Sequence, residues 1–81
     1  DGVNHKLRTV SEVKYTANQG YTKQIKDLVK FAVSRGYAAQ LIVPRGTYIS
    51  RSLAAAERRG EIKIIRAGGV GNKTSPTKKR K

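Results

Sequence analysis

The sequence predicts an α/β domain with a small mixed sheet, in which a β-hairpin is followed by βαβ-type crossovers. Two observations favour this fold class. Short apolar runs alternate with segments in which apolar residues recur at steps of three and four, the spacing of one helix face. Helices placed between short apolar strands imply crossover connections and a mostly parallel sheet.

Four segments have the character of strands. Residues 8–16 are rich in β-branched residues and Tyr, with polar and apolar positions interleaved. Residues 1–7 are expected to pair antiparallel to them. Residues 38–43 form a short apolar run ended by Pro44, which suits a strand buried on both faces. Residues 61–66 are expected to form the final strand.

Two helices are expected between these strands. Residues 22–35 carry the apolar spacing of an amphipathic helix, and Gly36 stands where a C-cap glycine belongs. Ser50 or Ser52 can cap a second, shorter helix that is rich in Ala and ends at Gly60. The connection before this second helix is expected to be a loop.

The charge balance points to a polyanionic partner. Eighteen Lys and Arg against five Asp and Glu give a formal net charge of +13, which favours nucleic acid or an acidic protein. Without Cys and with one His, disulfide scaffolds, Cys-based zinc sites and His-rich metal cages are excluded. No apolar run reaches the roughly 20 residues of a membrane span, so we expect no membrane anchoring in this segment.

The chain is expected to divide into a folded domain, residues 1–66, and a basic tail, residues 67–81. The domain holds all five acids and is basic without the tail. The tail is rich in Gly and has one isolated apolar residue, so we expect it to be disordered. It is either a solvated tail or an arm that adds affinity for a phosphate backbone.

Glu12 and Lys14 lie two positions apart on an expected strand, so their side chains share one face. Val13 and Tyr15 are then expected to face the core. A carboxylate beside an ammonium group suits metal-assisted phosphodiester hydrolysis, in which the lysine stabilises charge on the attacking water or the phosphate. The alternative is a solvated strand face with a weak ion pair, which short motifs of this kind more often represent.

A hard cation such as Mg²⁺ needs a second carboxylate. Asp1 is the nearest candidate, because a tight hairpin can bring it alongside Glu12. Gln24 lies in the first turn of the expected helix, where its amide can reach back toward the end of the strand that carries Glu12 and Lys14. For Gln24 alone, an ordinary polar helix residue is the favoured interpretation.

Other polar and aromatic side chains have weaker signals. His5 is interpreted as incidental rather than as a general base or phosphate contact. Tyr15, Tyr37 and Phe31 are expected to pack in the core, whereas Tyr21 and Tyr48 lie in loops and stay open. Candidate nucleic-acid contacts are basic residues of the body and tail, namely Lys23, Arg45, Arg51, Lys78, Lys79 and Arg80, with Arg58 and Arg59 as further possibilities.

Four motifs carry a resemblance to a known family: Asp1-Gly2, Glu12-Val13-Lys14, Tyr21-Thr22-Lys23-Gln24-Ile25 and Val43-Pro44-Arg45-Gly46-Thr47. With the short helix and strand that follow, residues 1 to about 66 resemble the restriction-endonuclease-fold nuclease domains at the C-termini of bacterial polymorphic toxins, including contact-dependent inhibition toxins.

The resemblance implies a PD-(D/E)xK superfamily core and divalent-metal-dependent DNA cleavage. Asp1 and Glu12 would hold Mg²⁺, or Mn²⁺ or Zn²⁺ in its place. Lys14 would be the catalytic lysine, and Gln24 would match a glutamine that some branches place beside the site. The superfamily's upstream helix is absent here, so we expect a core truncated at the N-terminus and a chain that is the C-terminal piece of a larger toxin polypeptide.

The expected function is therefore a DNase toxin in interbacterial competition, neutralised by an acidic cognate immunity protein. Such a toxin would be secreted or displayed on the surface of the producing bacterium and would act in the target-cell cytoplasm. An RNase toxin that cleaves tRNA or rRNA is one alternative. A non-catalytic basic module that binds nucleic acid is the other.

Overall fold

The structure, a computed structural model, describes residues 2–67 of the chain. Six strands and two helices follow one another along these residues. In chain order they are β1 (Gly2–Asn4), β2 (Thr9–Val13), β3 (Asn18–Gln19), α1 (Lys23–Arg35), β4 (Ala38–Pro44), β5 (Tyr48–Ile49), α2 (Arg51–Arg58) and β6 (Lys63–Ala67).

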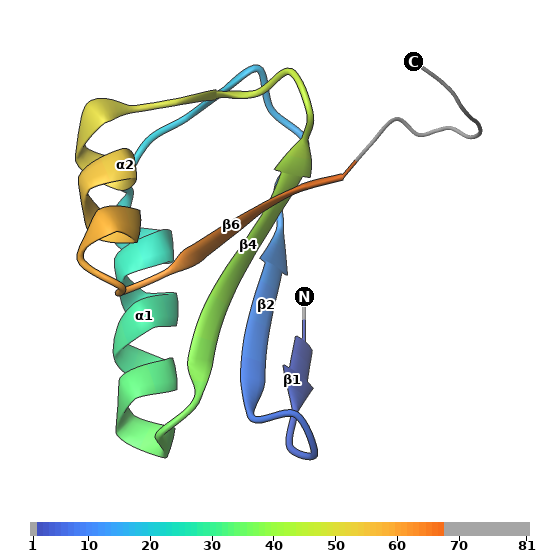
Figure 1. The fold of residues 1–81 in the computed structure, drawn as a ribbon, viewed down its shortest axis with the longest axis vertical. Helices are drawn as coiled ribbons and strands as arrows, with labels where there is room; N and C mark the ends of the chain where they lie inside the picture. Colours follow the sequence, from blue (N-terminus) through green and yellow to red (C-terminus); the bar gives the residue numbers. More distant parts are fainter. Residues whose placement is uncertain (1, 68–81) are drawn as a thin grey trace.

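The main sheet has the strand order β1-β2-β4-β6 (Figure 1). β1 pairs antiparallel with β2, and the pairs β2–β4 and β4–β6 are parallel. Each parallel pair is joined through a helix, as parallel strands require. The predicted α/β class, with a mixed sheet built from a hairpin and two crossovers, is confirmed, and it is consistent with a restriction-endonuclease-like fold.

Both helices begin at the side chains that the sequence suggests. Thr22 Oγ1 accepts a hydrogen bond from the Ile25 amide at 3.3 Å, and Ser50 Oγ accepts one from the Leu53 amide at 3.2 Å. These bonds satisfy amide groups that have no partner within a helix. α1 ends at Gly36, whose φ of 70° is left-handed and suits glycine.

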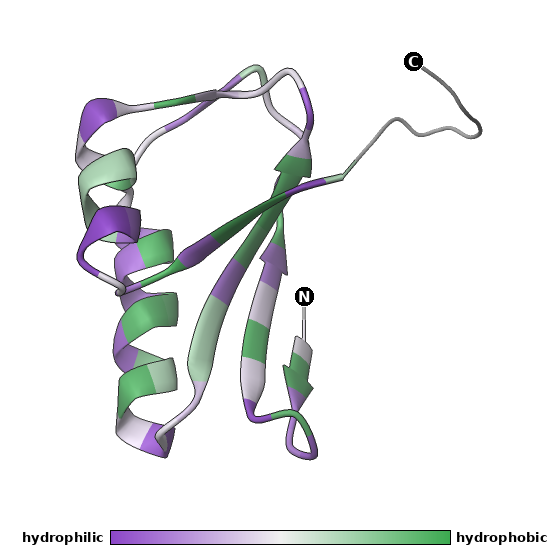
Figure 2. Ribbon diagram, in the orientation of Figure 1, coloured by the Kyte–Doolittle hydropathy of each residue, from purple (hydrophilic) through white to green (hydrophobic). Residues whose placement is uncertain are grey.

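Both helices pack on the same face of the sheet, where the core lies (Figure 1). Figure 2 shows hydrophobic and hydrophilic residues alternating along α1, as expected of a helix with one buried side. The fully or almost fully buried residues come from β2, β4, both helices and the residue just before β6, and they are Val10, Ile25, Val29, Ala32, Ala39, Leu41, Val43, Leu53, Ala56 and Ile62.

The prediction that residues 38–43 are buried on both faces is wrong. Burial alternates along β4: Ala39, Leu41 and Val43 are buried, whereas Gln40 and Ile42 are half-buried. The reason is that both described helices lie on one side of the sheet. Neither helix of residues 2–67 covers the side to which Gln40 and Ile42 point.

The expected facing of β2 is inverted. Val10 is buried against the helices, and it shares its face with Glu12 and Lys14 because strand side chains alternate. Tyr15, expected in the core, is 87% exposed. Alternation separates two sets of side chains but does not say which set faces the helices. Here Glu12 and Lys14 follow Val10 on the face of β2 that the helices cover.

Two aromatic residues of the α1 region behave differently. Phe31 is 39% exposed rather than buried, and the Arg35 guanidinium lies 4.8 Å from the centre of its ring. Tyr37 packs against the core as expected. Its hydroxyl lies 2.7 Å from Nδ1 of His5, so the tip of the hairpin is joined to the loop after α1.

A second, two-stranded parallel sheet, β3 with β5, forms where only loops were expected. It ties the connection after β2 to the connection after β4, so that both lie together beyond the carboxyl ends of these strands (Figure 1). β6 ends at Ala67, one residue past the expected boundary. Residues 68–81 lie outside the described part, and no helix of the described part is long and apolar enough to cross a membrane.

Candidate active site

Three polar side chains meet at the carboxyl end of β2: Glu12, Lys14 and Gln24, referred to below as the Glu12 cluster. Gln24 Nε2 donates a hydrogen bond to Oε2 of Glu12 at 3.2 Å. Lys14 Nζ donates to Oε1 of Gln24 at 2.5 Å and lies 3.5 Å from Oε2 of Glu12. The three residues that the sequence singles out on this strand and helix are therefore in mutual contact.

The backbone explains why they meet. Glu12 is the penultimate residue of β2, and the amide of Lys14 continues the ladder by donating to the Ile42 carbonyl at 3.0 Å. Gln24 is the second residue of α1, which starts next to this edge of the sheet. The side chains of Glu12 and Lys14 are 16% and 28% exposed, so both remain partly open to solvent.

Gln24 suits its position because its amide presents both a donor and an acceptor. The carbonyl oxygen accepts from the ammonium group of Lys14, and the amino group donates to the carboxylate of Glu12. A carboxylate in its place would repel Glu12, and a second cation would repel Lys14. The partial positive charge at the N-terminus of α1 also favours negative charge in this place.

Glu12 fits one ligand position of a hard divalent cation, for which carboxylate oxygens are the preferred donors. Its second oxygen, Oε1, accepts no hydrogen bond from residues 2–67. Within those residues no group of three or more His, Cys, Asp or Glu side chains gathers. The other expected ligand, Asp1, lies outside the described residues. Residues 2–67 therefore supply one carboxylate to the Glu12 cluster.

The expected nucleic-acid contacts are spread around this end of the domain. Lys23 is the neighbour of Gln24 in α1, and its Nζ forms an ion pair with Asp27 at 2.9 Å. Arg45 and Arg51 are exposed in the connection after β4 and at the start of α2. Between Glu12 and Glu57 the chain has one acid, Asp27, so these basic side chains have little negative charge near them in sequence. The tail residues Lys78, Lys79 and Arg80 lie outside the described residues.

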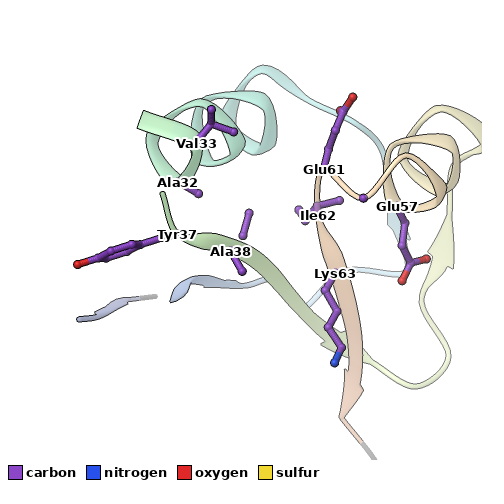
Figure 3. Close-up of a pocket in the computed structure, with 10 residues that line it drawn as sticks. Ala32, Val33, Tyr37, Ala38, Glu57, Glu61, Ile62 and Lys63 are labelled. Atoms are coloured by element: carbon purple, nitrogen blue, oxygen red, sulfur yellow. The ribbon is translucent and has the colours of Figure 1, made fainter. Parts of the chain in front are cut away.

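A pocket of about 470 Å³ lies away from the Glu12 cluster, and it holds two acids (Figure 3). In Figure 3 the carboxylates of Glu57 and Glu61 point in different directions. Glu57 Oε2 accepts a hydrogen bond from the Ile64 amide at 3.2 Å. Both groups therefore have structural partners, and this pocket does not offer converging metal ligands.

Glu61 belongs to a network that joins the segment just before α1 to the segment just before β6. It accepts hydrogen bonds from Arg59 Nε at 2.7 Å and from the Tyr21 hydroxyl at 2.8 Å. The bond from Arg59, together with the one from Tyr21, lowers the pKa of the Glu61 carboxyl. Burial, followed by the bond to Glu61, raises the pKa of the Tyr21 hydroxyl. This network connects the segment that precedes α1 to the segment that follows α2, through side chains that belong to neither helix.

The sequence reasoning missed the residues that hold the connections at this end of the sheet. Thr47 is 4% exposed, and its Oγ1 donates to the Thr16 carbonyl at 2.6 Å. Arg66 Nη1 donates to the carbonyls of Thr47 and Arg45 at 2.8 and 3.0 Å. The one available signal was the position of Arg66 at the end of a strand, where its side chain can reach the ends of neighbouring connections.

Comparison with protein families gives a match over most of this region. The family described as restriction endonuclease fold toxin 7 matches residues 1–53, a range that contains all members of the Glu12 cluster and ends inside α2. Searches of curated proteins and of solved structures each found no match. By this match the chain belongs to the restriction endonuclease fold toxin 7 family.

Proposed function

We propose that this domain is a toxin nuclease that hydrolyses phosphodiester bonds in DNA with the aid of a divalent metal ion. The observation that carries the proposal is the convergence of Glu12, Lys14 and Gln24 at one end of β2. The family to which the chain belongs has the restriction endonuclease fold, and this supports nuclease chemistry. The strongly basic composition supports a nucleic-acid substrate.

In this proposal Glu12 and Asp1 hold the metal ion, which is Mg²⁺ or, in its place, Mn²⁺ or Zn²⁺. Gly2 pairs with Ser11, the residue before Glu12, and Asp1 directly precedes Gly2 in the chain. When bound, a divalent cation supplies positive charge that polarises the scissile phosphate.

The protein side chains have separate tasks. The ammonium group of Lys14 stabilises the negative charge that develops on the phosphate during attack by water. Gln24 holds Lys14 and Glu12 in place through its two hydrogen bonds and does not itself exchange protons. Basic side chains contact the phosphate backbone on either side of the scissile bond, and these are Lys23, Arg45 and Arg51. The tail residues Lys78, Lys79 and Arg80 add further affinity.

The biological setting is also a proposal. A domain of this family would be the C-terminal part of a larger toxin that a bacterium secretes or displays and that acts in the cytoplasm of a competitor. A producer needs protection, so a cognate immunity protein is expected. The +13 charge of the chain makes an acidic protein the complementary partner.

The test is to incubate the purified domain with plasmid DNA and with total RNA, each in Mg²⁺ and in EDTA. The proposal predicts that plasmid is degraded in Mg²⁺ and remains intact in EDTA. Cleavage of RNA alone would reassign the substrate to RNA, and cleavage that persists in EDTA would overturn the role of the metal. Salt-dependent binding with no cleavage in Mg²⁺, Mn²⁺ or Zn²⁺ would identify a non-catalytic binding module.

A further inference from the structure

We propose that Tyr48 stacks on an unpaired nucleobase of the substrate, so that the domain prefers a single-stranded or locally opened strand at its site. This inference rests on the proposed function, because it names the form of nucleic acid that the Glu12 cluster receives.

Tyr48 is 64% exposed although its neighbours on both sides are packed. Thr47 is buried, and Ile49 packs against the core. Tyr48 is paired in register with Asn18 of β3, and both residues are exposed. The side chain therefore stands on the outer face of the small β3–β5 sheet, where it contributes little to the core.

The backbone beneath Tyr48 is held by several hydrogen bonds. Its own amide donates to the Ala17 carbonyl at 2.8 Å, and the buried Thr47 hydroxyl donates to the Thr16 carbonyl. Arg66 donates to the carbonyl of Thr47 from β6, the strand paired with β4. A ring on such a firmly attached segment loses little conformational entropy when it binds a flat partner, which is what a stacking platform needs.

Tyr48 also lies at the functional end of the domain. Ala17, to which its amide is bonded, follows Lys14 by three positions, and β3–β5 is formed by the two connections that leave β2 and β4 (Figure 1). The connection that carries Tyr48 also carries Arg45, and Arg51 starts the helix that follows. An exposed aromatic ring among basic side chains is the combination by which proteins hold single strands, because the cations contact phosphates while the ring stacks on a base.

The interior of a duplex presents no base face to this ring, because its bases are stacked on both sides within the helix. Aromatic stacking on a base therefore distinguishes single strands from duplexes, whereas contacts to phosphates serve both. Removing a ring that stacks on a base lowers the binding affinity by about five-fold to about a hundred-fold per base.

The experiment measures binding of the full chain, with Glu12→Gln present to prevent cleavage, to a short labelled single-stranded DNA and to the same sequence as a duplex. The variants Tyr48→Ala and Tyr48→Phe are compared, and Val33→Ala is the control, since Val33 is 70% exposed at the other end of α1. Unchanged urea denaturation midpoints establish that the variants are folded; alanine at position 48 keeps the amide bonded to Ala17.

The proposal predicts that Tyr48→Ala weakens single-strand binding by about five-fold or more, that Tyr48→Phe and Val33→Ala do not, and that duplex binding is unchanged. A single strand without bases should bind the parent and Tyr48→Ala proteins equally. Unaltered single-strand binding by Tyr48→Ala would overturn the proposal. The exposed ring would then be assigned to a contact with a protein partner. The binding assay does not depend on cleavage, so it tests the role of Tyr48 separately from the proposed function. Absence of nuclease activity in the parent chain would refute the proposed function without changing the outcome of the binding assay.

Discussion

Gln24 donates a hydrogen bond from Nε2 to the carboxylate of Glu12 at 3.2 Å, across twelve positions of sequence and from a different element of structure. The same amide accepts from Lys14 through its oxygen. One neutral side chain thus bridges an acid and a base whose charged atoms lie 3.5 Å apart. This relationship makes the cluster sensitive to changes at Gln24 that leave both charged residues in place.

Gln24→Ala is expected to lower the cleavage rate by about 10- to 100-fold, the usual cost of losing a residue that positions a metal ligand. The Mg²⁺ concentration needed for half-maximal activity should rise, because Glu12 loses a donor that orients it. Steady-state cleavage across a Mg²⁺ series measures both. Lys23→Ala is the control in the same helical turn, and equal effects of the two variants on the Mg²⁺ requirement would contradict a positioning role for Gln24.

Lys14→Ala and Lys23→Ala each remove one positive charge near the cluster, but their effects should differ. Lys14 contacts the other members of the cluster, whereas Lys23 pairs with Asp27 on the surface of α1. We expect Lys14→Ala to abolish cleavage while DNA binding persists. Lys23→Ala should retain cleavage. The slope of the logarithm of the binding constant against the logarithm of the salt concentration should become shallower by about 1, the value for one lost phosphate contact. Binding and cleavage measured on the same preparations separate these effects, and retained cleavage in Lys14→Ala would remove the lysine from the mechanism.

Thr47→Val tests the attachment of the connection after β4. Valine has nearly the shape of threonine but leaves the Thr16 carbonyl without its donor, in a position that is 4% exposed. The free energy of unfolding should fall by about 1–3 kcal/mol. Urea denaturation measures this value, with Thr9→Val on the half-exposed start of β2 as the matched change. A loss no larger than that of Thr9→Val would show that the bond does not hold the connection.

The Tyr21–Glu61–Arg59 network predicts a loss of stability at both ends of the pH range. The pKa of Glu61 is lowered in the folded protein, so in acid the unfolded chain binds more protons, and this stabilisation is lost as the pH falls through the lowered pKa. The pKa of Tyr21 is raised, so its contribution is present below the usual tyrosine pKa and is lost as the pH rises through the raised value. Unfolding free energies measured by urea across pH should show smaller acid dependence in Glu61→Gln and smaller alkaline dependence in Tyr21→Phe. Unaltered curves in these variants would exclude the network as the cause.

Much of this arrangement follows from sequence patterns alone. Spacing places Glu12 and Lys14 on one face of a strand, and the apolar period places Gln24 in the first turn of a helix. Gly36 and Ser50 mark helix ends as their chemistry requires. These features are local, because each depends on residues within a few positions of one another.

Long-range features could not be obtained in this way. The facing of β2 depends on which side the helices cover, and the exposed Tyr15 and the buried Val10 show that the apolar pattern at the end of a strand is a poor guide to it. The strands β3 and β5 have two residues each, too few for any period. Their pairing, and the bonds from Arg66 to the carbonyls of Arg45 and Thr47, join residues that lie about twenty to thirty positions apart.

A catalytic Glu12 and a Glu12 that only forms a solvated ion pair differ in one outcome. That outcome is the rate of plasmid cleavage in Mg²⁺ by the parent protein, by Glu12→Gln and by Glu57→Gln, which removes the same charge at a distant pocket. If Glu12 is catalytic, Glu12→Gln is folded, binds DNA and does not cleave it, while Glu57→Gln cleaves as the parent does. Undiminished cleavage by folded Glu12→Gln would show that this carboxylate is not catalytic.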